Sequence, residues 1–320
     1  MCTFILSRNL EQPIQRFRLT NTSFGQMTDC DCYQIKSFVR AVGSTGRVQH
    51  LDLTLCYALI DISSDFLFCK TLRVLKLNMV TLKSLPWVDF PLLKVLHLHD
   101  IKILDGKANL VPQILSACPK VEDLEVEDAF DDYEAIDEYK RLPKLFRAVI
   151  EKYVVPLKVV KNVQLLIIRN KDLNRRINDP IPLFHNLTHL EVNSDCFCEV
   201  NPTIFWHDVF SLVKHCPKLQ NLSIEMGNFE FPSGVDDCPF SQGRVPRCLS
   251  SHLQTCLLEN YTGIHWEFKF AKYIMENARF LKDMIICYNT DEEVDMFDRT
   301  IELSFCSRLS PTCNLSINKF

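Results

Sequence analysis

A thirteen-residue pattern occurs twice in the chain, at residues 114–126 (ILSACPKVEDLEV) and 212–224 (LVKHCPKLQNLSI), and it restricts the fold more than any other feature. In both copies an apolar segment runs into Cys-Pro-Lys. An aliphatic residue, two polar residues, Leu, one polar residue and a second aliphatic residue follow. The two last aliphatic residues point to the same side of a β-strand, because side chains alternate along a strand. The pattern L-x-x-L-x-L therefore predicts a strand with one buried side.

This L-x-x-L-x-L pattern recurs along the whole chain when Ile, Val, Phe, Cys or Met is allowed in place of Leu. Its middle positions are 21 to 42 residues apart, an irregular spacing typical of leucine-rich repeats with insertions. The widest gap contains a degenerate copy made by Leu142, Leu145, Ala148 and Ile150. The ten complete sets of anchors are Ile14/Phe17/Leu19, Val48/Leu51/Leu53, Leu72/Leu75/Leu77, Leu93/Leu96/Leu98, Val121/Leu124/Val126, Val163/Leu166/Ile168, Leu187/Leu190/Val192, Leu219/Leu222/Ile224, Leu253/Cys256/Leu258 and Leu281/Met284/Ile286.

A single repeat cannot bury its anchors alone, but stacked repeats can, with each strand paired to the next in a parallel sheet. The sequence thus predicts an α/β fold, a right-handed leucine-rich-repeat solenoid (horseshoe) with about ten or eleven parallel strands. The pattern lapses between Gly227 and Gly243, which places a domain boundary there. We expect residues 1–238 to form the solenoid and residues 239–320 to continue or cap the same sheet, because this last part keeps the repeat's own anchors.

Helices are expected where apolar residues recur at helical spacing. These segments are residues 34–41, 202–218, about 264–278 and 292–305. Strands are expected at residues 281–288 and 313–317.

Composition excludes several classes of protein. The 320 residues are 47% hydrophobic and 24% charged, as in folded globular proteins, and the net charge of -4 gives no reason to expect nucleic acid as the partner. No run approaches the about 20 apolar residues that cross a bilayer, and the first residues lack a secretory signal. We therefore expect no membrane association and a cytoplasmic or nuclear location. The fifteen cysteines are then expected to be reduced, with Cys118, Cys216 and Cys256 as small core residues.

Polar residues beside the anchors are expected on the opposite, concave side of the sheet, which is the usual partner-binding surface of solenoids. An exposed sheet face explains most of them equally well. The residues chosen as candidates for partner binding are Lys76, His97, His99, Asp123, Glu125, Glu127, Arg169, His189, Glu191, Asn221 and Glu225, with His50, Asp52, Asn78, Asn193 and Glu259 beside them.

Two local patterns carry an alternative interpretation. His97 and His99 belong to one predicted strand and Asp123, Glu125 and Glu127 to the next, a constellation suited to metal binding or acid–base chemistry. Alternating polar residues are also what an exposed sheet face requires, so we expect no catalytic residue, no metal and no cofactor. The acidic run at residues 127–138 is either a solvated loop or a docking site for a basic partner.

The C-terminal segment closely resembles the FBD domain of plant F-box/leucine-rich-repeat proteins. Shorter phrases at residues 142–145 and 161–166 also match repeats of that family. The motifs that carry the resemblance lie at residues 245–246 (VP), 248–253 (CLSSHL), 259–263 (ENYTG), 270–278 (FAKYIMENA) and 281–284 (LKDM).

The resemblance implies a non-enzymatic scaffold that binds a protein substrate for an F-box ubiquitin ligase. Members of the family begin with an F-box of about 45 residues, and Met1 falls where that module should already have ended. We therefore expect binding to the adaptor of a cullin-type ligase only if an F-box is supplied upstream. The alternative from another functional class is a receptor that holds a small signalling molecule on the concave face.

Overall fold

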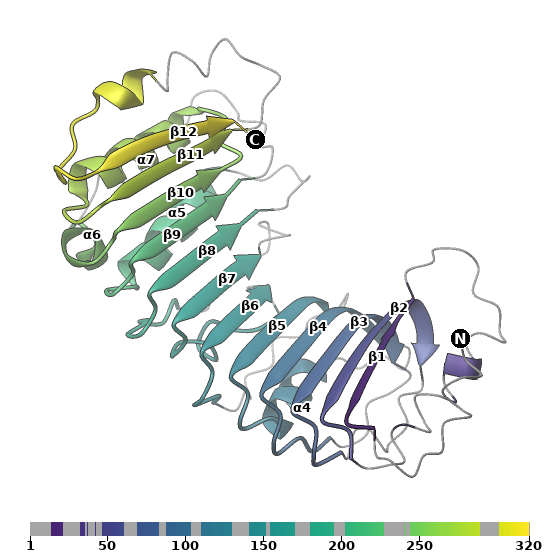
Figure 1. The fold of residues 1–320 in the computed structure, drawn as a ribbon. Helices are drawn as coiled ribbons and strands as arrows, with labels where there is room; N and C mark the ends of the chain where they lie inside the picture. The colour runs from purple at the N-terminus through teal and green to yellow at the C-terminus, as the bar shows by residue number, and fades with distance from the viewer. Residues whose placement is uncertain are drawn as a thin grey trace. The chain divides into compact units, whose positions relative to one another are not determined.

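The computed structural model forms two compact units, Met1–Val155 and Pro156–Phe320 (Figure 1). Each unit contains a parallel sheet whose strands follow one another in sequence order. The structure describes residues 14–21, 33–35, 37, 42, 47–60, 69–82, 88–103, 110–129, 141–151, 154–169, 180–194, 202–226, 240, 244–288 and 301–319.

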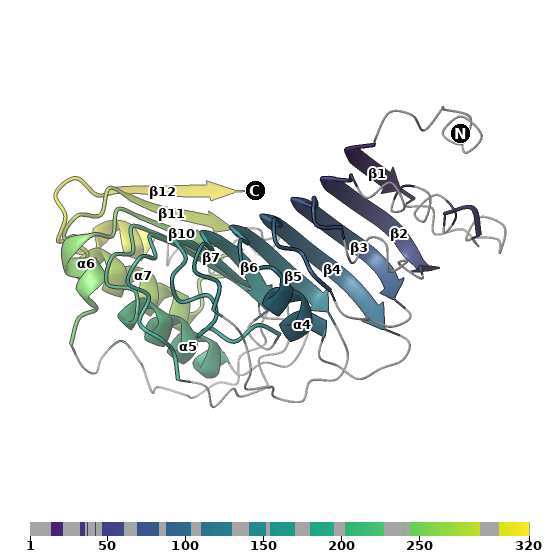
Figure 2. The same ribbon diagram turned by 90° about the horizontal axis from the view of Figure 1, so that it is seen from below.

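In the first unit, six strands pair in parallel, each with the next in the chain. The described helix α4 lies on one side of the strands (Figure 2). The elements are β1 (Arg16–Thr20), β2 (His50–Ile60), β3 (Val74–Leu82), β4 (Val95–Ile103), α4 (Leu110–Ala117), β5 (Asp123–Ala129) and β6 (Arg147–Glu151).

In the second unit, six more strands pair in parallel in the same consecutive order. Helices α5, α6 and α7 all lie on one side of this sheet (Figure 2). The elements are β7 (Leu165–Arg169), β8 (His189–Asn193), α5 (Pro202–Lys214), β9 (Asn221–Glu225), α6 (Arg247–Ser251), β10 (Thr255–Glu259), α7 (His265–Asn277), β11 (Asp283–Tyr288) and β12 (Asn314–Lys319).

The anchors meet in rows across the strands, as the repeat predicted. Leu75 lies in register with Leu96, Leu96 with Leu124, and Leu124 with Ala148 of the degenerate copy. All four side chains are buried. Two rows of this kind per sheet build an apolar core on one face, which confirms the α/β leucine-rich-repeat solenoid. Twelve strands, one more than the upper expectation, occur in the described residues.

A backbone hydrogen-bond ladder fixes the alignment of these rows. The carbonyl of Lys94, just before β4, accepts hydrogen bonds from the amides of Glu122 and Asp123 at 2.8 and 3.0 Å. The carbonyl of Glu122 in turn accepts from the amides of Phe146 and Arg147 at 2.8 and 3.1 Å. Because the same link joins one repeat to the next, the register of each strand is set where it begins.

The repeated Cys-Pro-Lys sequence forms a tight turn ahead of a strand. The amide of Val121 donates to the carbonyl of Cys118 at 3.2 Å, and the amide of Leu219 donates to that of Cys216 at 3.2 Å. Proline suits the second position of such a turn because its φ is already fixed. Both cysteines are fully buried, and burial raises the pKa of their thiols. The expected role of these cysteines as core residues is confirmed, and that of the buried Cys256 likewise.

Three strands of the first unit change direction at equivalent places. Met79, Asp100 and Asp128 each have a positive φ, between 47° and 52°. The residues after Met79 and Asp100 belong to the next buried row, since Val80 and Ile101 are both 0% exposed. A left-handed residue interrupts the two-residue alternation of the strand, so that two buried anchors can stand three positions apart.

The C-terminal segment continues the sheet of the second unit rather than forming a separate globule. Strand β10 pairs with β9, and Cys256 lies in register with Leu222. Helix α7 packs against α5 through aromatic rings, with centroids of Trp206 and Phe270 4.8 Å apart and those of Phe210 and Tyr273 5.5 Å apart. These contacts confirm that the last repeats extend the solenoid. The boundary at residues 238 and 239 lies outside the described residues and stays a prediction.

Most expected elements occur where the sequence placed them. Helix α7 covers 265–277 against an expected 264–278, and α5 covers 202–214 against an expected 202–218. Residues 301–305 are helical, whereas the rest of the expected helix at 292–305 and most of that at 34–41 lie outside the described residues. The short helix α6 was not expected. None of the described helices is long and apolar enough to cross a membrane.

A buried carboxylate closes the turn that leads into α7. Glu267 is 1% exposed and accepts hydrogen bonds from the amides of Thr262 and Gly263, at 2.8 and 2.7 Å, and from the Thr262 hydroxyl at 3.0 Å. It occupies the third helical position, from which acidic side chains reach back to unpaired amides before a helix. Burial raises the pKa of Glu267 to about 8, although these donors act to lower it.

Truncating a buried anchor should weaken the fold. We expect Leu222→Ala in β9 to lower the free energy of unfolding by about 2–5 kcal/mol, because it removes a buried side chain and leaves a cavity. Leu183→Ala is the matched control in the same unit, since Leu183 is 46% exposed whereas Leu222 is 2% exposed. Urea unfolding followed by circular dichroism measures both. Equal losses for the two variants would contradict the assignment of Leu222 to the core.

Glu267 should make stability depend on pH. Its folded pKa of about 8 lies above the ordinary value of 4.5, so between these values the unfolded chain releases a proton that the folded chain keeps. Stability is then complete below about pH 4.5 and falls by roughly 1 kcal/mol per pH unit as the pH rises toward 8. Urea unfolding at pH 5.5 and 7.5 should show a smaller decrease for Glu267→Gln. Identical decreases would mean that Glu267 is ionised in the folded protein.

Candidate functional site

The first unit has one sheet face that carries polar side chains, on the side opposite the anchors. We call it the open face; its charged residues include Asp52, Lys76, Asp123, Arg147 and Glu151. These side chains alternate with the buried anchors along each strand, and the register of the strands brings them into rows. The rows place residues far apart in the sequence within reach of one another.

A histidine–carboxylate cluster occupies the centre of the open face. It consists of His97 and His99 on β4 and Asp123, Glu125 and Glu127 on β5. His97 lies in register with Glu125, and His99 with Glu127. The structure thus brings together the two histidines and three carboxylates that the sequence placed on neighbouring strands.

Every ring nitrogen of the two histidines faces a carboxylate oxygen. His97 Nε2 is 3.2 Å from Asp123 Oδ2, and His97 Nδ1 is 3.2 Å from Glu125 Oε2. His99 Nε2 is 3.0 Å from the same Glu125 Oε2, and His99 Nδ1 is 3.4 Å from Glu127 Oε2. Glu125 Oε2 is therefore the point at which both rings converge.

Arg147 of β6 completes the cluster from the next repeat. Its Nη1 lies 2.7 Å from Asp123 Oδ1 and also donates to Glu125 Oε1. One guanidinium thus holds two carboxylates that are only two positions apart on β5. Arg147 was not among the residues predicted from the sequence. The degenerate copy at residues 142–150 was the available signal, because it places Arg147 at the start of the next strand.

The close contacts shift the ionisation of the cluster. Hydrogen bonds to Glu125 and Glu127 raise the pKa of His99 to about 9, against burial, which lowers it. Burial raises the pKa of Glu125, but hydrogen bonds from His99 and Arg147 outweigh it and bring the pKa down to about 2. The pKa of Asp123 is lowered in the same way by His97 and Arg147, again against burial. At neutral pH both of these carboxylates are ionised.

The other candidate residues do not belong to the histidine–carboxylate cluster. Lys76 is half-buried on the open face in register with His97. In the second unit, His189 Nε2 lies 2.9 Å from Asn221 Nδ2, and Glu191 accepts from Asn193 Nδ2 at 3.0 Å. Arg169 lies in register with Asn193, and Asn193 with Glu225.

The acidic side chains of the second unit lie close enough for their charges to shift the pKa of Glu259. Burial, followed by the charges of Glu225 and Glu191, raises the pKa of Glu259. Glu225 also accepts from Asn260 Nδ2 at 3.4 Å. These contacts differ from those of the first unit, where Arg147 and His99 lie against the carboxylates.

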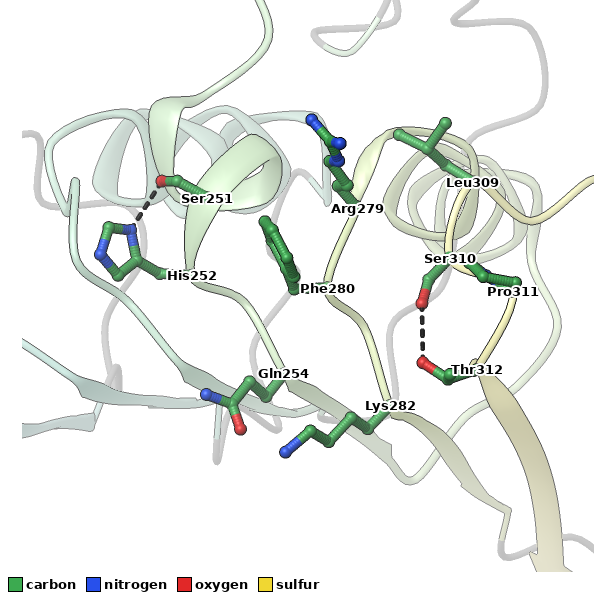
Figure 3. Close-up of a pocket in the computed structure, with 10 residues that line it drawn as sticks. All are labelled: Ser251, His252, Gln254, Arg279, Phe280, Lys282, Leu309, Ser310, Pro311 and Thr312. Carbon is green, nitrogen blue, oxygen red and sulfur yellow. Dashed lines mark hydrogen bonds between the residues drawn. The ribbon is translucent and has the colours of Figure 1, made fainter.

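A pocket of about 1010 Å³ lies at the turns that precede β10, β11 and β12, and the sequence had not indicated it (Figure 3). Phe280, which is 50% exposed, stands in the middle of the lining. Arg279 and Lys282 bring positive charge, and none of the lining residues is acidic. The pocket therefore suits an acidic group beside an apolar one. Its lining consists of Ser251, His252, Gln254, Arg279, Phe280, Lys282, Leu309, Ser310, Pro311 and Thr312.

Comparison with known proteins identifies the last repeats. The FBD family model matches residues 242–286, which span α6, β10, α7 and most of β11. No solved structure gives a significant match to the chain.

Three proteins from Arabidopsis thaliana are similar over most of the chain. An F-box/FBD/LRR-repeat protein is 27% identical over 77% of this chain and 68% of its own length. An FBD-associated F-box protein is 29% identical over 70% of this chain and 64% of its own. A second F-box/FBD/LRR-repeat protein is 24% identical over 78% of this chain and 67% of its own. The chain thus spans about two thirds of these relatives, and the resemblance to the plant F-box/FBD/leucine-rich-repeat family is confirmed.

Removing Arg147 should destabilise the first unit. Arg147→Gln leaves Asp123 and Glu125 side by side without their shared cation, and their side chains are only 30% and 16% exposed. We expect a loss of about 1–3 kcal/mol, between the values for exposed and buried ion pairs.

Lys94→Gln is the matched control for Arg147→Gln. It breaks the pair with Glu122, whose side chains are 47% and 44% exposed, and should cost less than about 1 kcal/mol. Urea unfolding of both variants measures the difference. A loss from Arg147→Gln no greater than that from Lys94→Gln would show that Arg147 does not hold the cluster together.

Proposed function

We propose that this chain, which is similar over most of its length to plant F-box/FBD/leucine-rich-repeat proteins, is a non-enzymatic protein-binding scaffold. In this proposal it acts as the substrate-recognition part of an F-box-type ubiquitin ligase receptor. The names of the relatives point to protein interactions in F-box pathways. The substrate itself is a protein whose chemistry is inferred from the surface that receives it.

The observation that carries the proposal is the open face of the first unit. At about 4.8 Å between strands, its six strands extend over about 24 Å, a length suited to a protein segment. The side chains at its centre are already fixed by mutual contacts, such as those of Arg147 with Asp123 and Glu125. A fixed surface loses less side-chain entropy on binding than a flexible one.

The charges of this face favour a basic partner segment. Strands β5 and β6 carry five carboxylates, those of Asp123, Glu125, Glu127, Asp128 and Glu151. The cations beside them are Arg147 of β6 and His99 of β4, whose pKa is raised to about 9. Electrostatic complementarity chiefly sets specificity and the rate of association. We therefore expect the bound segment to present Lys or Arg side chains to β5 and β6.

A pull-down from plant extract with the purified chain as bait tests the proposal. Glu127→Lys reverses a charge at the edge of the cluster, and Lys120→Ala changes an exposed residue in the turn before β5 as a control. We expect a protein that the original chain and the control retain and that Glu127→Lys loses at least tenfold.

Two results would contradict the proposal. One is equal recovery of all proteins by Glu127→Lys and the control, which would show that the open face is not the binding surface. The other is stabilisation of the chain by a metabolite in a thermal-shift screen, with no protein retained in the pull-down. That result would favour the receptor for a small signalling molecule.

A further inference from the structure

We propose that His97, His99 and Glu125 form a binding site for a divalent transition-metal ion, with Zn²⁺ as the probe ion. The inference concerns the same open face as the proposed function but does not depend on it, because it follows from the geometry of these side chains alone. It goes against the expectation from the sequence, where the spacing of the residues gave no reason to prefer a metal site over an exposed polar face.

Three possible ligand atoms converge at one point. His97 Nδ1 and His99 Nε2 lie 3.2 and 3.0 Å from Glu125 Oε2, and the ligand atoms of the three residues are all within 4.8 Å of one another. Zn²⁺ binds imidazole nitrogen and carboxylate oxygen at about 2.0–2.2 Å, which places tetrahedral ligands about 3.4 Å apart. The two nitrogen–oxygen separations are close to this spacing.

The surroundings of the three residues are those of a metal site as well. Histidines that bind metals usually direct their second ring nitrogen to a carboxylate or carbonyl, which fixes the orientation of the ring. His97 directs its Nε2 to Asp123 Oδ2 at 3.2 Å, and His99 directs its Nδ1 to Glu127 Oε2 at 3.4 Å. The other oxygen of Glu125 accepts from Arg147.

A neutral imidazole has one N–H, so each ring can donate to only one of the two carboxylates that face it. When the outer nitrogens donate to Asp123 and Glu127, His97 Nδ1 and His99 Nε2 present lone pairs toward Glu125 Oε2, and a metal ion between these three atoms accepts them. In the metal-free chain a second proton on His99 makes the contact to Glu125 instead, as the raised pKa of this histidine indicates.

The set of ligands indicates the kind of ion. Two imidazoles and one carboxylate suit Zn²⁺ and other first-row transition ions better than Mg²⁺ or Ca²⁺, which prefer oxygen ligands alone. Three protein ligands leave one position of a tetrahedral ion open. Partial burial of the cluster, with side-chain exposures of 10% for His97 and 16% for Glu125, limits competition from bulk water.

Zinc titration of the purified, chelator-treated chain tests the site. We expect one Zn²⁺ ion per chain that is absent from the double variant His97→Gln/His99→Gln. Because cysteine thiols elsewhere in the chain can also bind zinc, X-ray absorption of the zinc-loaded chain should supply the second readout. It should show nitrogen and oxygen at about 2.0–2.2 Å, without the sulfur shell at about 2.3 Å that thiolates give.

Two single variants keep the test decisive if the double variant fails to fold. Asp123→Asn retains all three ligands but weakens the support of His97, and should lower zinc affinity by about tenfold or more. His189→Ala removes a histidine of the second unit and should leave zinc binding unchanged. Equal zinc binding by all variants, or a shell of sulfur, would overturn the proposal. A negative pull-down would leave these measurements unaffected, so the failure of one proposal is distinguishable from the failure of the other.

Discussion

The backbone link between successive repeats is the constraint on which the rest of the structure depends. Ahead of most of the described strands, one carbonyl, such as that of Lys94 or Gln254, accepts hydrogen bonds from two amides of the following repeat. A shift of one residue would turn every anchor of the strand to the polar face. The same link that buries Leu124 therefore decides that Glu125, rather than Leu124 or Val126, lies opposite His97. Core and candidate site share a single register.

Sequence was sufficient for the parts of the fold that repeat. The anchors and the Cys-Pro-Lys turn recur with the same physical task, so ten copies support one another, and α7 was expected to within one residue at each end. Contacts that occur in one repeat alone could not be predicted in this way. Arg147 lies within a degenerate copy, α6 has five residues, and the pocket around Phe280 arises from three separate turns. The cluster of His97 and His99 was visible as a pattern, but its convergence on one oxygen of Glu125 depends on side-chain directions that the pattern does not specify.

Histidines at polar strand positions make different side-chain contacts because the residues on the neighbouring strand differ. His97 and His99 each lie between carboxylates, whereas the described contacts of His189 are with Thr188 and Asn221. The repeat supplies the same backbone to all three. What differs is the next strand, where β5 provides acids and β9 an amide. In a solenoid of this kind the chemistry of a residue is thus decided largely by the next repeat, which for these contacts lies 26 or 32 positions away in the sequence.

The left-handed residues in β3, β4 and β5 have a consequence for how this chain tolerates change. The turn of the backbone at Met79, Asp100 and Asp128 is the same, although the residues differ and none is glycine. A left-handed conformation costs roughly 1 kcal/mol or more for most residues, and less for Asp. The chain has only eight glycines in 320 residues, and at these three positions it carries the cost of a left-handed conformation. A substitution to glycine at one of these positions would remove the strain and so offset a destabilising substitution elsewhere in the chain. The exposed side chains of the repeats could then change without loss of the fold.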